Sequence, residues 1–159
     1  RQIFETVFEI AGPGSIEGGD ILYTGREILV GTSERTDHAG IAELSVFVEP
    51  KGYSARTVET PPGVLHFKTD CSLIASKTIL STQRLAASGC FSDYRVLQVP
   101  EGEEAAANMI RFNDALIMSE GFPKTAQMLM SEGFNVVQLN NSECAKIDGG
   151  MSCLSLRIA

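Results

Sequence analysis

Residues 109–139 read MIRFNDALIMSEGFPKTAQMLMSEGFNVVQL, and this stretch contains one complete structural unit. Its first ten residues hold two apolar runs on either side of Asn113-Asp114, a pattern typical of a hairpin. Pro123 opens a segment whose apolar side chains recur at helical spacing, and a third apolar run ends the stretch. The predicted order is therefore strand, strand, helix, strand.

The same order is predicted for residues 20–59. A short hairpin comes first, followed by a helix for which Thr36 is the expected N-cap. Pro50 is expected to stop this helix, because proline disrupts a helix interior. Residues 53–57 then form the closing strand of the unit.

A further copy of the pattern spans residues 72–99, with a helix capped near Ser81 or Thr82. The flanking segments 6–10 and 154–158 are predicted as single strands of units whose other elements lie outside the chain. The chain therefore contains about three units, with incomplete ones at each end.

Repeated units of about 40 to 50 residues favour a radial or linear stack in which each unit packs against its neighbours. The predicted fold class is α/β, with a propeller-like arrangement. An ordinary α/β sandwich with the same element order is the alternative. No linker or low-complexity tract divides the chain, so residues 1–159 are predicted to form a single domain.

The charge and composition limit the partners. The net charge is −7 with 13 basic and 20 acidic residues, and no cluster of Lys and Arg occurs, which argues against nucleic acid and anionic membranes. A small cationic substrate is compatible with this charge. No apolar run reaches membrane-spanning length, and no signal peptide is visible. The chain begins with Arg1 rather than Met, which indicates that it was processed, cut or sequenced from the middle, so a targeting signal could have been lost.

The cysteines indicate a reducing compartment. The four of them include no Cys-x-x-Cys pair, and with only two histidines no zinc site can be assembled. A chain of this length can bury enough apolar surface without disulfides. We therefore expect a cytoplasmic protein without metal or other cofactor.

Four features carry reactive groups. The turn EGGD, residues 17–20, combines flexible glycines with carboxylates that could hold a cation, although a solvated tight turn is the ordinary interpretation. His66 lies in an apolar segment, where a core histidine is commoner than a catalyst. Cys153 follows DGGMS, and buried cysteine is usually a small hydrophobe. Arg35 precedes a helix start and could bind a carboxylate, although an ordinary surface arginine is commoner.

Read together, these segments resemble the dimethylarginine dimethylaminohydrolases, over residues 6–159. The resemblance rests on four segments in this order: EGGDILYTGRE, SERT, LHFKTDCS and DGGMSC. That family belongs to the pentein superfamily, whose fold is a ring of five strand-strand-helix-strand blades around a central active site. The resemblance covers the carboxyl-terminal portion of the family, so about three of the five blades are expected.

The resemblance also implies residue roles. Cys153 would be the nucleophile, His66 the acid and base, and Glu17 the carboxylate that binds the guanidinium group and orients His66. Three further substrate contacts are implied, by Arg35, by the backbone carbonyl of Ile147 and by Asp20. The other three cysteines are expected to be structural.

The implied reaction converts N-omega-methylated arginine to citrulline and an alkylamine without a cofactor, through a covalent cysteine intermediate. Arginine deiminase activity is the nearest alternative, an amidinotransferase is a more distant one, and a non-catalytic pentein binding module is a third. The absent amino-terminal blades would remove a carboxylate and an arginine from the site. We therefore expect the isolated chain to be poorly active, and to associate with a second copy or with a separate amino-terminal part. A fragment that misfolds is the alternative.

Overall fold

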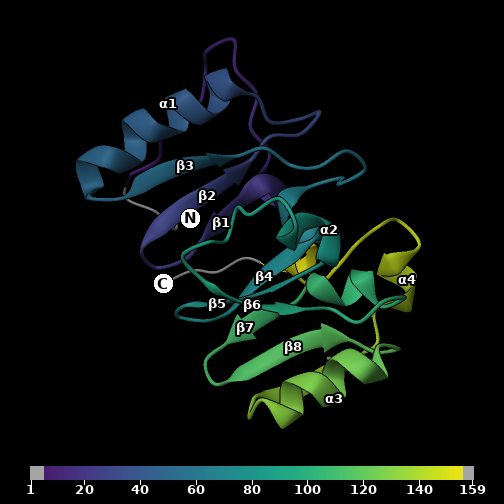
Figure 1. The fold of residues 1–159 in the computed structure, drawn as a ribbon. Coiled ribbons are helices and arrows are strands. Elements are labelled where there is room, and N and C mark those ends of the chain that lie inside the picture. The colour runs from purple at the N-terminus through teal and green to yellow at the C-terminus, as the bar shows by residue number, and fades with distance from the viewer. Residues whose placement is uncertain (1–5, 156–159) are drawn as a thin grey trace.

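A computed structural model describes residues 6–155 as a mixed α/β fold with three small sheets (Figure 1). The strands are β1 (Ile21–Tyr23), β2 (Glu27–Gly31) and β3 (Ser54–Val58); β4 (Cys71–Ala75), β5 (Thr78–Ser81) and β6 (Arg95–Gln98); and β7 (Ile110–Phe112), β8 (Ala115–Ser119) and β9 (Asn135–Leu139). The α-helices are α1 (His38–Val48), α2 (Gln83–Ala86), α3 (Pro123–Ser131) and α4 (Ser142–Ala145). The 3-10 helices are η1 (Gly18–Asp20), η2 (Glu49–Lys51), η3 (Phe67–Thr69), η4 (Glu104–Ala107) and η5 (Ser152–Leu154).

All three sheets have the same topology. In each, the first two strands form an antiparallel hairpin, and the third strand returns through a helix to pair in parallel with the second. The Asn113 backbone takes a positive φ of 54° at the tight turn between β7 and β8, as suits this residue type. The strand, strand, helix, strand order predicted for the three units is confirmed.

The N-cap of α1 differs from the prediction. Asp37 occupies this position and accepts the backbone N–H of Gly40 at 2.8 Å. Thr36 instead donates its hydroxyl hydrogen to Asp20 at 2.6 Å, so it is not available to cap the helix. Both residue types can cap a helix, and the tertiary contact decides between them.

The two predicted flanking strands have different outcomes. Residues 6–10 have no regular structure, and the prediction of a strand there is wrong. Phe8 instead stacks on Phe47 of α1, with ring centroids 4.9 Å apart. The other predicted strand starts at Leu154, which ends η5, and its residues 156–158 lie outside the described residues.

The cores join neighbouring sheets. One apolar cluster contains Leu29 and Phe67 with Ile79, and so connects the first sheet to the second. Another contains Leu80 with Leu129, and connects the second sheet to the third unit. Each of these five side chains is fully buried, and truncating one leucine to alanine typically costs about 2–5 kcal/mol. Packing between successive units is the arrangement expected of a repeat fold.

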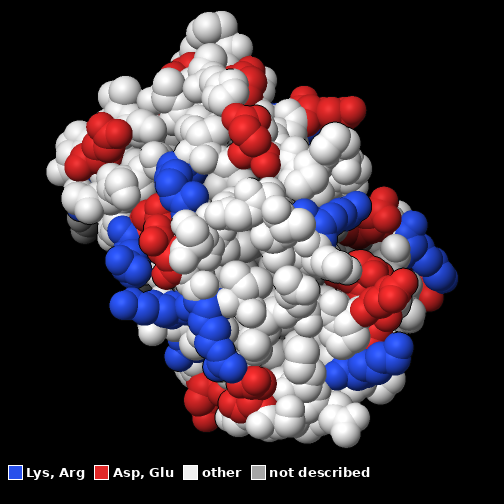
Figure 2. Space-filling model, in the orientation of Figure 1, with Lys and Arg blue, Asp and Glu red and all other residues white. Residues whose placement is uncertain are grey.

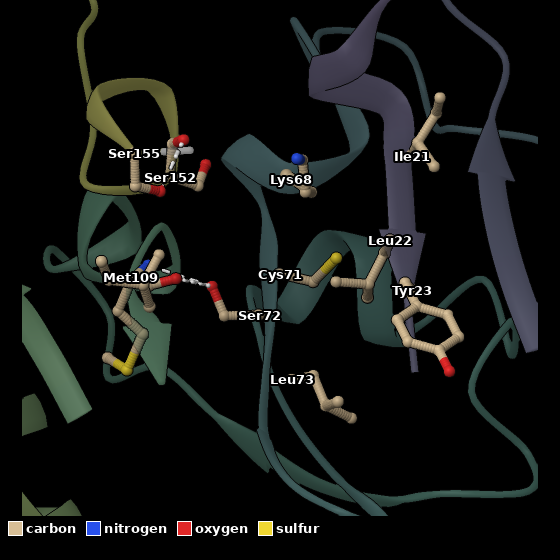
Figure 3. A pocket seen from close by; sticks show the side chains of 11 residues that line it. Ile21, Leu22, Tyr23, Lys68, Cys71, Ser72, Leu73, Met109, Ser152 and Ser155 are labelled. Atoms are coloured by element: carbon tan, nitrogen blue, oxygen red, sulfur yellow. Dashed lines mark hydrogen bonds between the residues drawn. The ribbon is translucent and has the colours of Figure 1, made fainter. Parts of the chain in front are cut away.

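The first strands of the three sheets share a cavity of about 340 Å³ (Figure 3). Its wall includes Leu22 of β1, Cys71 of β4 and Ile110 of β7, and it also includes Ser152 of η5. The sheets therefore present equivalent strands to one central space, and the segment that carries Cys153 borders the same space.

The surface carries charges of both signs. Figure 2 shows Lys, Arg, Asp and Glu side chains around a largely uncharged middle, without a broad area of Lys and Arg alone on this face. Within residues 6–155, none of the helices has the length and apolar character required to cross a membrane.

Candidate active site

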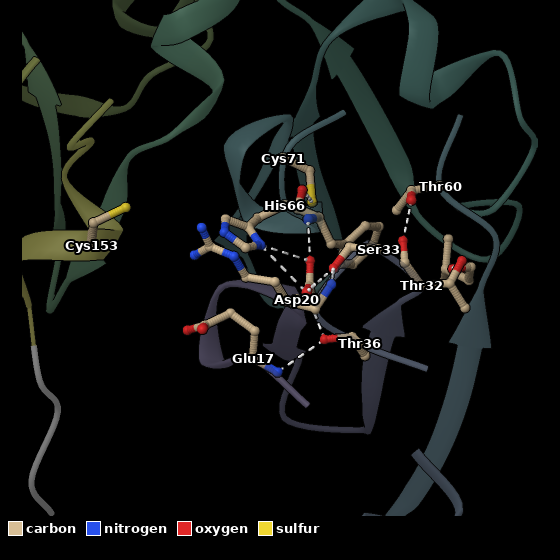
Figure 4. A network of polar contacts seen from close by, with 12 residues as sticks. Glu17, Asp20, Thr32, Ser33, Thr36, Thr60, His66, Cys71 and Cys153 are labelled. Atoms are coloured by element: carbon tan, nitrogen blue, oxygen red, sulfur yellow. Dashed lines mark hydrogen bonds and ion pairs between the residues drawn. The ribbon is translucent and has the colours of Figure 1, made fainter. Parts of the chain in front are cut away.

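The site is organised around the buried carboxylate of Asp20, which lies at the end of η1 directly before β1. Asp20 accepts hydrogen bonds from the hydroxyl groups of Ser33 (2.7 Å) and Thr36 (2.6 Å) and from the backbone N–H of Phe67 (2.9 Å). Figure 4 shows these contacts converging on the one side chain. A buried charge requires such partners, and here they connect three separate segments of the chain.

His66 lies beside Asp20, directly before η3. Its Nδ1 is 3.4 Å from the Asp20 carboxylate, and its side chain is 16% exposed. The ring also rests on the backbone of Gly19, where a Cβ atom would come within 3.0 Å of the imidazole Cγ. A side chain at the second glycine of the EGGD turn would therefore press against His66. The carboxylate-imidazole pair suits acid-base chemistry.

Asp20, rather than Glu17, lies beside the His66 ring. The resemblance implies that Glu17 orients His66, but the carboxylate beside the ring is that of Asp20. Glu17 is half-buried and donates its backbone N–H to the Thr36 hydroxyl at 2.9 Å. The buried carboxylate of Asp20, which was expected to contact substrate, is occupied by protein donors.

Arg35 lies on the loop that Asp20 holds through Ser33 and Thr36. Its side chain is exposed, and its backbone N–H donates to the Ser33 hydroxyl at 3.0 Å. Together with residues 60–65, it lines a second cavity, of about 560 Å³. The loops that carry Arg35 and His66 therefore face each other.

Cys153 is exposed and lies in η5, after the turn Asp148-Gly149-Gly150. Asp148 has a positive φ of 59°, and Ile147 before it is 82% exposed. Figure 4 shows the sulfur directed toward the side where Glu17 and His66 lie. Within the described part of the chain, no hydrogen bond joins Cys153 to His66.

The sequence analysis missed Asn108, which lies shortly before β7. Its Oδ1 accepts the backbone N–H of Ser152 at 2.9 Å, and its Nδ2 lies 3.8 Å from the Sγ of Cys153. A signal was present in the repeat, because a polar residue precedes the first strand of each sheet. These residues are Asp20, Asp70 and Asn108, and all are buried.

A third cavity, of about 540 Å³, connects the His66 and Cys153 loops. It is lined by Leu65 and Thr69 from the first loop, by Asp148 and Gly150 from the second, and by Asn108. The segments that carry the two reactive residues therefore border a common space, although neither His66 nor Cys153 is among the residues that line it. Residues 6–155 contain no group of three His, Cys, Asp or Glu side chains arranged to hold a metal ion.

Two other cysteines are unsuited to nucleophilic attack. Burial raises the pKa of the Cys71 thiol well above its ordinary value, and Cys71 donates to the backbone carbonyl of Phe67. Burial also raises the pKa of the half-buried Cys90. A raised pKa reduces the thiolate population at neutral pH, so both fit the structural role predicted for them.

Known proteins resemble this chain in sequence over most of its length. A family model described as arginine deiminase matches residues 2–58. The dimethylarginine dimethylaminohydrolase of Pseudomonas aeruginosa is 35% identical over 151 residues, which are 95% of this chain and 59% of that protein. This chain is a homologue of the dimethylarginine dimethylaminohydrolases. The resemblance inferred from the four motifs is confirmed.

Solved structures of dimethylarginine dimethylaminohydrolases match the fold closely. A cysteine-to-serine variant of the Pseudomonas aeruginosa protein complexed with citrulline gives a TM-score of 0.88 at 34% identity, over 93% of this chain and 58% of that one. A histidine-to-glycine variant, an adduct with S-methyl-L-thiocitrulline, matches with the same values. The N-terminal domain of a cyanobacterial arginine dihydrolase gives 0.85 at 22% identity, over 97% of this chain and 60% of that one, which is a likeness of fold.

This homologue of the dimethylarginine dimethylaminohydrolases spans somewhat more than half the length of the curated relatives that it matches. The cavities described above are therefore those of residues 6–155 alone.

Proposed function

We propose that this chain carries the Cys-His part of a site that hydrolyses the guanidinium group of N-omega-methylated arginine to citrulline and an alkylamine. The observation that carries the proposal is the pairing of His66 with buried Asp20 at 3.4 Å. The loop before the exposed Cys153 lines a cavity together with Leu65 and Thr69, which lie near His66 in the chain. A homologue at 35% identity is named as an enzyme of this class.

Residue spacing in the solved relatives supports this assignment. The histidine changed in one of these structures is numbered 87 positions before the cysteine changed in the other, and His66 is also 87 positions before Cys153. Both structures match this chain over the same shares of their length. Cys153 and His66 therefore correspond in spacing to the two positions altered in these solved structures.

The proposed reaction has two steps. The Cys153 thiolate attacks the guanidinium carbon, and the bond from that carbon to the methylated nitrogen breaks as His66 protonates the departing amine. A water molecule then attacks the same carbon and gives a proton to His66. The carbon-sulfur bond breaks, which releases citrulline and restores the thiolate. Asp20 lies 3.4 Å from the imidazole and holds the ring in place for both proton transfers.

The substrate contacts in this proposal are those that the resemblance implies. We assign Glu17 to the guanidinium group, Arg35 to the substrate carboxylate and the Ile147 carbonyl to the amino group. Asp20 acts through the position of His66 and the Arg35 loop, because its oxygens already accept hydrogen bonds from the protein. The three sheets are, in this proposal, three blades of a pentein-type propeller.

Citrulline release from N,N-dimethylarginine tests the proposal, with the chain assayed alone and after addition of the remaining part of the Pseudomonas aeruginosa relative. Cys153→Ser is expected to abolish release, because a serine hydroxyl is far less nucleophilic than a thiolate. Cys90→Ser is the matched control and is expected to retain activity. Equal losses in the two variants would refute the assignment of Cys153.

Arginine is the second candidate substrate, because the family model that matches residues 2–58 is that of arginine deiminase. Both substrates yield citrulline, but dimethylarginine releases dimethylamine and arginine releases ammonia. The ratio of kcat/KM for the two substrates decides between them, since it measures the difference in transition-state binding.

A further inference from the structure

Two reactive side chains are held in the same way, by residues at equivalent positions of the repeat. Asp20, before β1, accepts the backbone N–H of the residue after His66 at 2.9 Å. Asn108, before β7, accepts the backbone N–H of the residue before Cys153 at 2.9 Å. The paired residues are 47 and 44 positions apart, which is close to the length of one repeat unit. Each polar residue therefore reaches from its own unit to the entrance of the next.

The orientation of the Asn108 amide follows from this contact. The backbone N–H of Ser152 is a donor, so the atom that receives it must be the carbonyl oxygen Oδ1. The amide nitrogen Nδ2 is consequently directed at the Sγ of Cys153, 3.8 Å away. Asn108 is only 5% exposed, so water has little access to the amide.

The surrounding structure fixes Asn108 on both sides. The Ser72 hydroxyl donates to the carbonyl of Ala107 (2.6 Å) or of Met109 (2.8 Å), and it accepts the N–H of Met109 at 3.0 Å. On the other side, a Cβ atom on Gly150 would lie 2.1 Å from the Nδ2 of Asn108. The glycine therefore allows the amide to lie directly against the cysteine loop.

The two equivalent positions carry different side chains: Asp20 is a carboxylate beside His66, whereas Asn108 is a neutral amide beside Cys153. A carboxylate beside His66 can hold the imidazole ring in place, whereas a carboxylate beside a thiol would oppose formation of the thiolate. A neutral N–H donor stabilises the thiolate instead. We propose that Asn108 is a positioning residue that holds the Cys153 loop through Oδ1 and stabilises the Cys153 thiolate through Nδ2. This inference rests on the proposed role of Cys153 as nucleophile.

Other charged groups around the thiol remain unchanged in the test. His66 and Glu17 lie on the side toward which the sulfur points (Figure 4), and Asp148 is in the same loop. Lys68, from η3, lines the central cavity together with Ser152 (Figure 3). Because these four groups are the same in every variant, a change in the pH dependence of Cys153 alkylation reports on the substitution at Asn108.

The pH dependence of alkylation by iodoacetamide, followed at the Cys153 peptide by mass spectrometry, tests the inference without requiring turnover. Asn108→Asp keeps an oxygen for the Ser152 N–H but replaces the amide donor with a negative charge. The midpoint of alkylation is expected to move to higher pH by about 1 unit or more, because a like charge near 4 Å opposes thiolate formation. Asn108→Ala, which adds no charge, is expected to give a smaller upward shift.

Asn141→Ala is the matched control, because the Asn141 side chain donates to the carbonyl of Gly149 in the same loop at 3.1 Å. Asn141→Ala is expected to leave the midpoint within about 0.3 pH units of the original value, because the contact that it removes is neutral and does not involve the thiol. If both Asn108 variants resemble Asn141→Ala, the inference is overturned. The proposed function fails separately, if Cys153→Ser retains citrulline release.

Discussion

The Nδ1 atom of His66 lies 3.4 Å from the carboxylate of Asp20, a residue 46 positions earlier in the chain. Asp20 is fully buried, and it accepts the backbone N–H next to His66 as well as facing the ring. One side chain therefore sets both the position and the electrostatic environment of the proposed acid and base.

His66→Ala is expected to lower citrulline formation by about 100-fold or more, the range typical for loss of a general acid and base. The leaving amine would no longer be protonated, and water would no longer be activated. His38→Ala is the control, because His38 is an exposed residue at the start of α1 that pairs with Glu59 at 3.4 Å. Steady-state rates of the two variants provide the measurement, and full activity of His66→Ala would remove it from the mechanism.

Gly19→Ala is expected to impair the site while Gly18→Ala leaves it intact. A Cβ atom at Gly19 would meet the His66 ring at 3.0–3.3 Å, so the ring must shift by a few tenths of an ångström. At Gly18 a Cβ atom would meet no atom within 4 Å. Displacement of a catalytic group by a fraction of an ångström lowers kcat, and we expect a loss of about tenfold. Similar kcat values for the two variants would show that the close approach to His66 is unimportant.

Much of the fold could be predicted from the sequence, because the apolar periodicity of each unit is local. The hairpins, the helix start at Pro123 and the parallel return strands all follow from turn chemistry and side-chain alternation. The failures have tertiary causes. Thr36 is a good N-cap residue, but its hydroxyl is used by Asp20, and residues 6–10 pack through Phe8 on α1 rather than in a sheet.

The candidate site was predictable only in part. The resemblance identified Cys153 and His66 as candidates, and the segments that carry them line one cavity. It assigned the orientation of His66 to Glu17, whereas geometry gives that contact to Asp20, three residues later in the same turn. Asn108 belongs to none of the four motifs. Its contact with Cys153 depends on the packing of one repeat unit against the next, which periodicity alone does not specify.

Stability is expected to fall in acid because of Glu27 in β2. Hydrogen bonds from the Arg56 guanidinium, at 2.8 and 3.1 Å, are the main cause of its lowered pKa, and partial burial opposes them. Tyr94 adds a bond of 2.8 Å. A carboxylate whose pKa is lower in the folded than in the unfolded state stabilises the fold above the ordinary carboxyl pKa of 4.5, and this contribution is lost as pH falls through the folded value.

Urea denaturation at pH 7 and at pH 3.5 measures this contribution. Glu27→Gln is expected to lower the free energy of unfolding at pH 7 by about 1 kcal/mol, because the pair is partly exposed, and to reduce the loss between the two pH values. Glu143→Gln is the control, since its pair with Lys146 is largely exposed. An unchanged pH dependence in Glu27→Gln would assign the acid sensitivity to other carboxylates.

Open strand edges and exposed apolar side chains are expected to make the chain associate. Each of the three sheets ends in strands with a free edge in residues 6–155, and the third sheet also exposes apolar side chains. Phe112 of β7 is 62% exposed and Leu139 of β9 is 46% exposed. Apolar side chains beside open strand edges favour pairing with another chain. We therefore expect the purified chain to form dimers or larger species, or to bind the remaining part of a relative when that part is supplied.

Light scattering of the chain should give a mass above 17.1 kDa at micromolar concentration. Phe112→Ser is expected to reduce the association, whereas Val46→Ser on α1, which is also exposed at 68%, is the control away from the third sheet. The same preparation should release citrulline slowly. A site that lacks one partner of a desolvated guanidinium group binds about 2–5 kcal/mol more weakly, which is more than tenfold in affinity. A stable monomer with ordinary turnover would contradict both halves of the prediction.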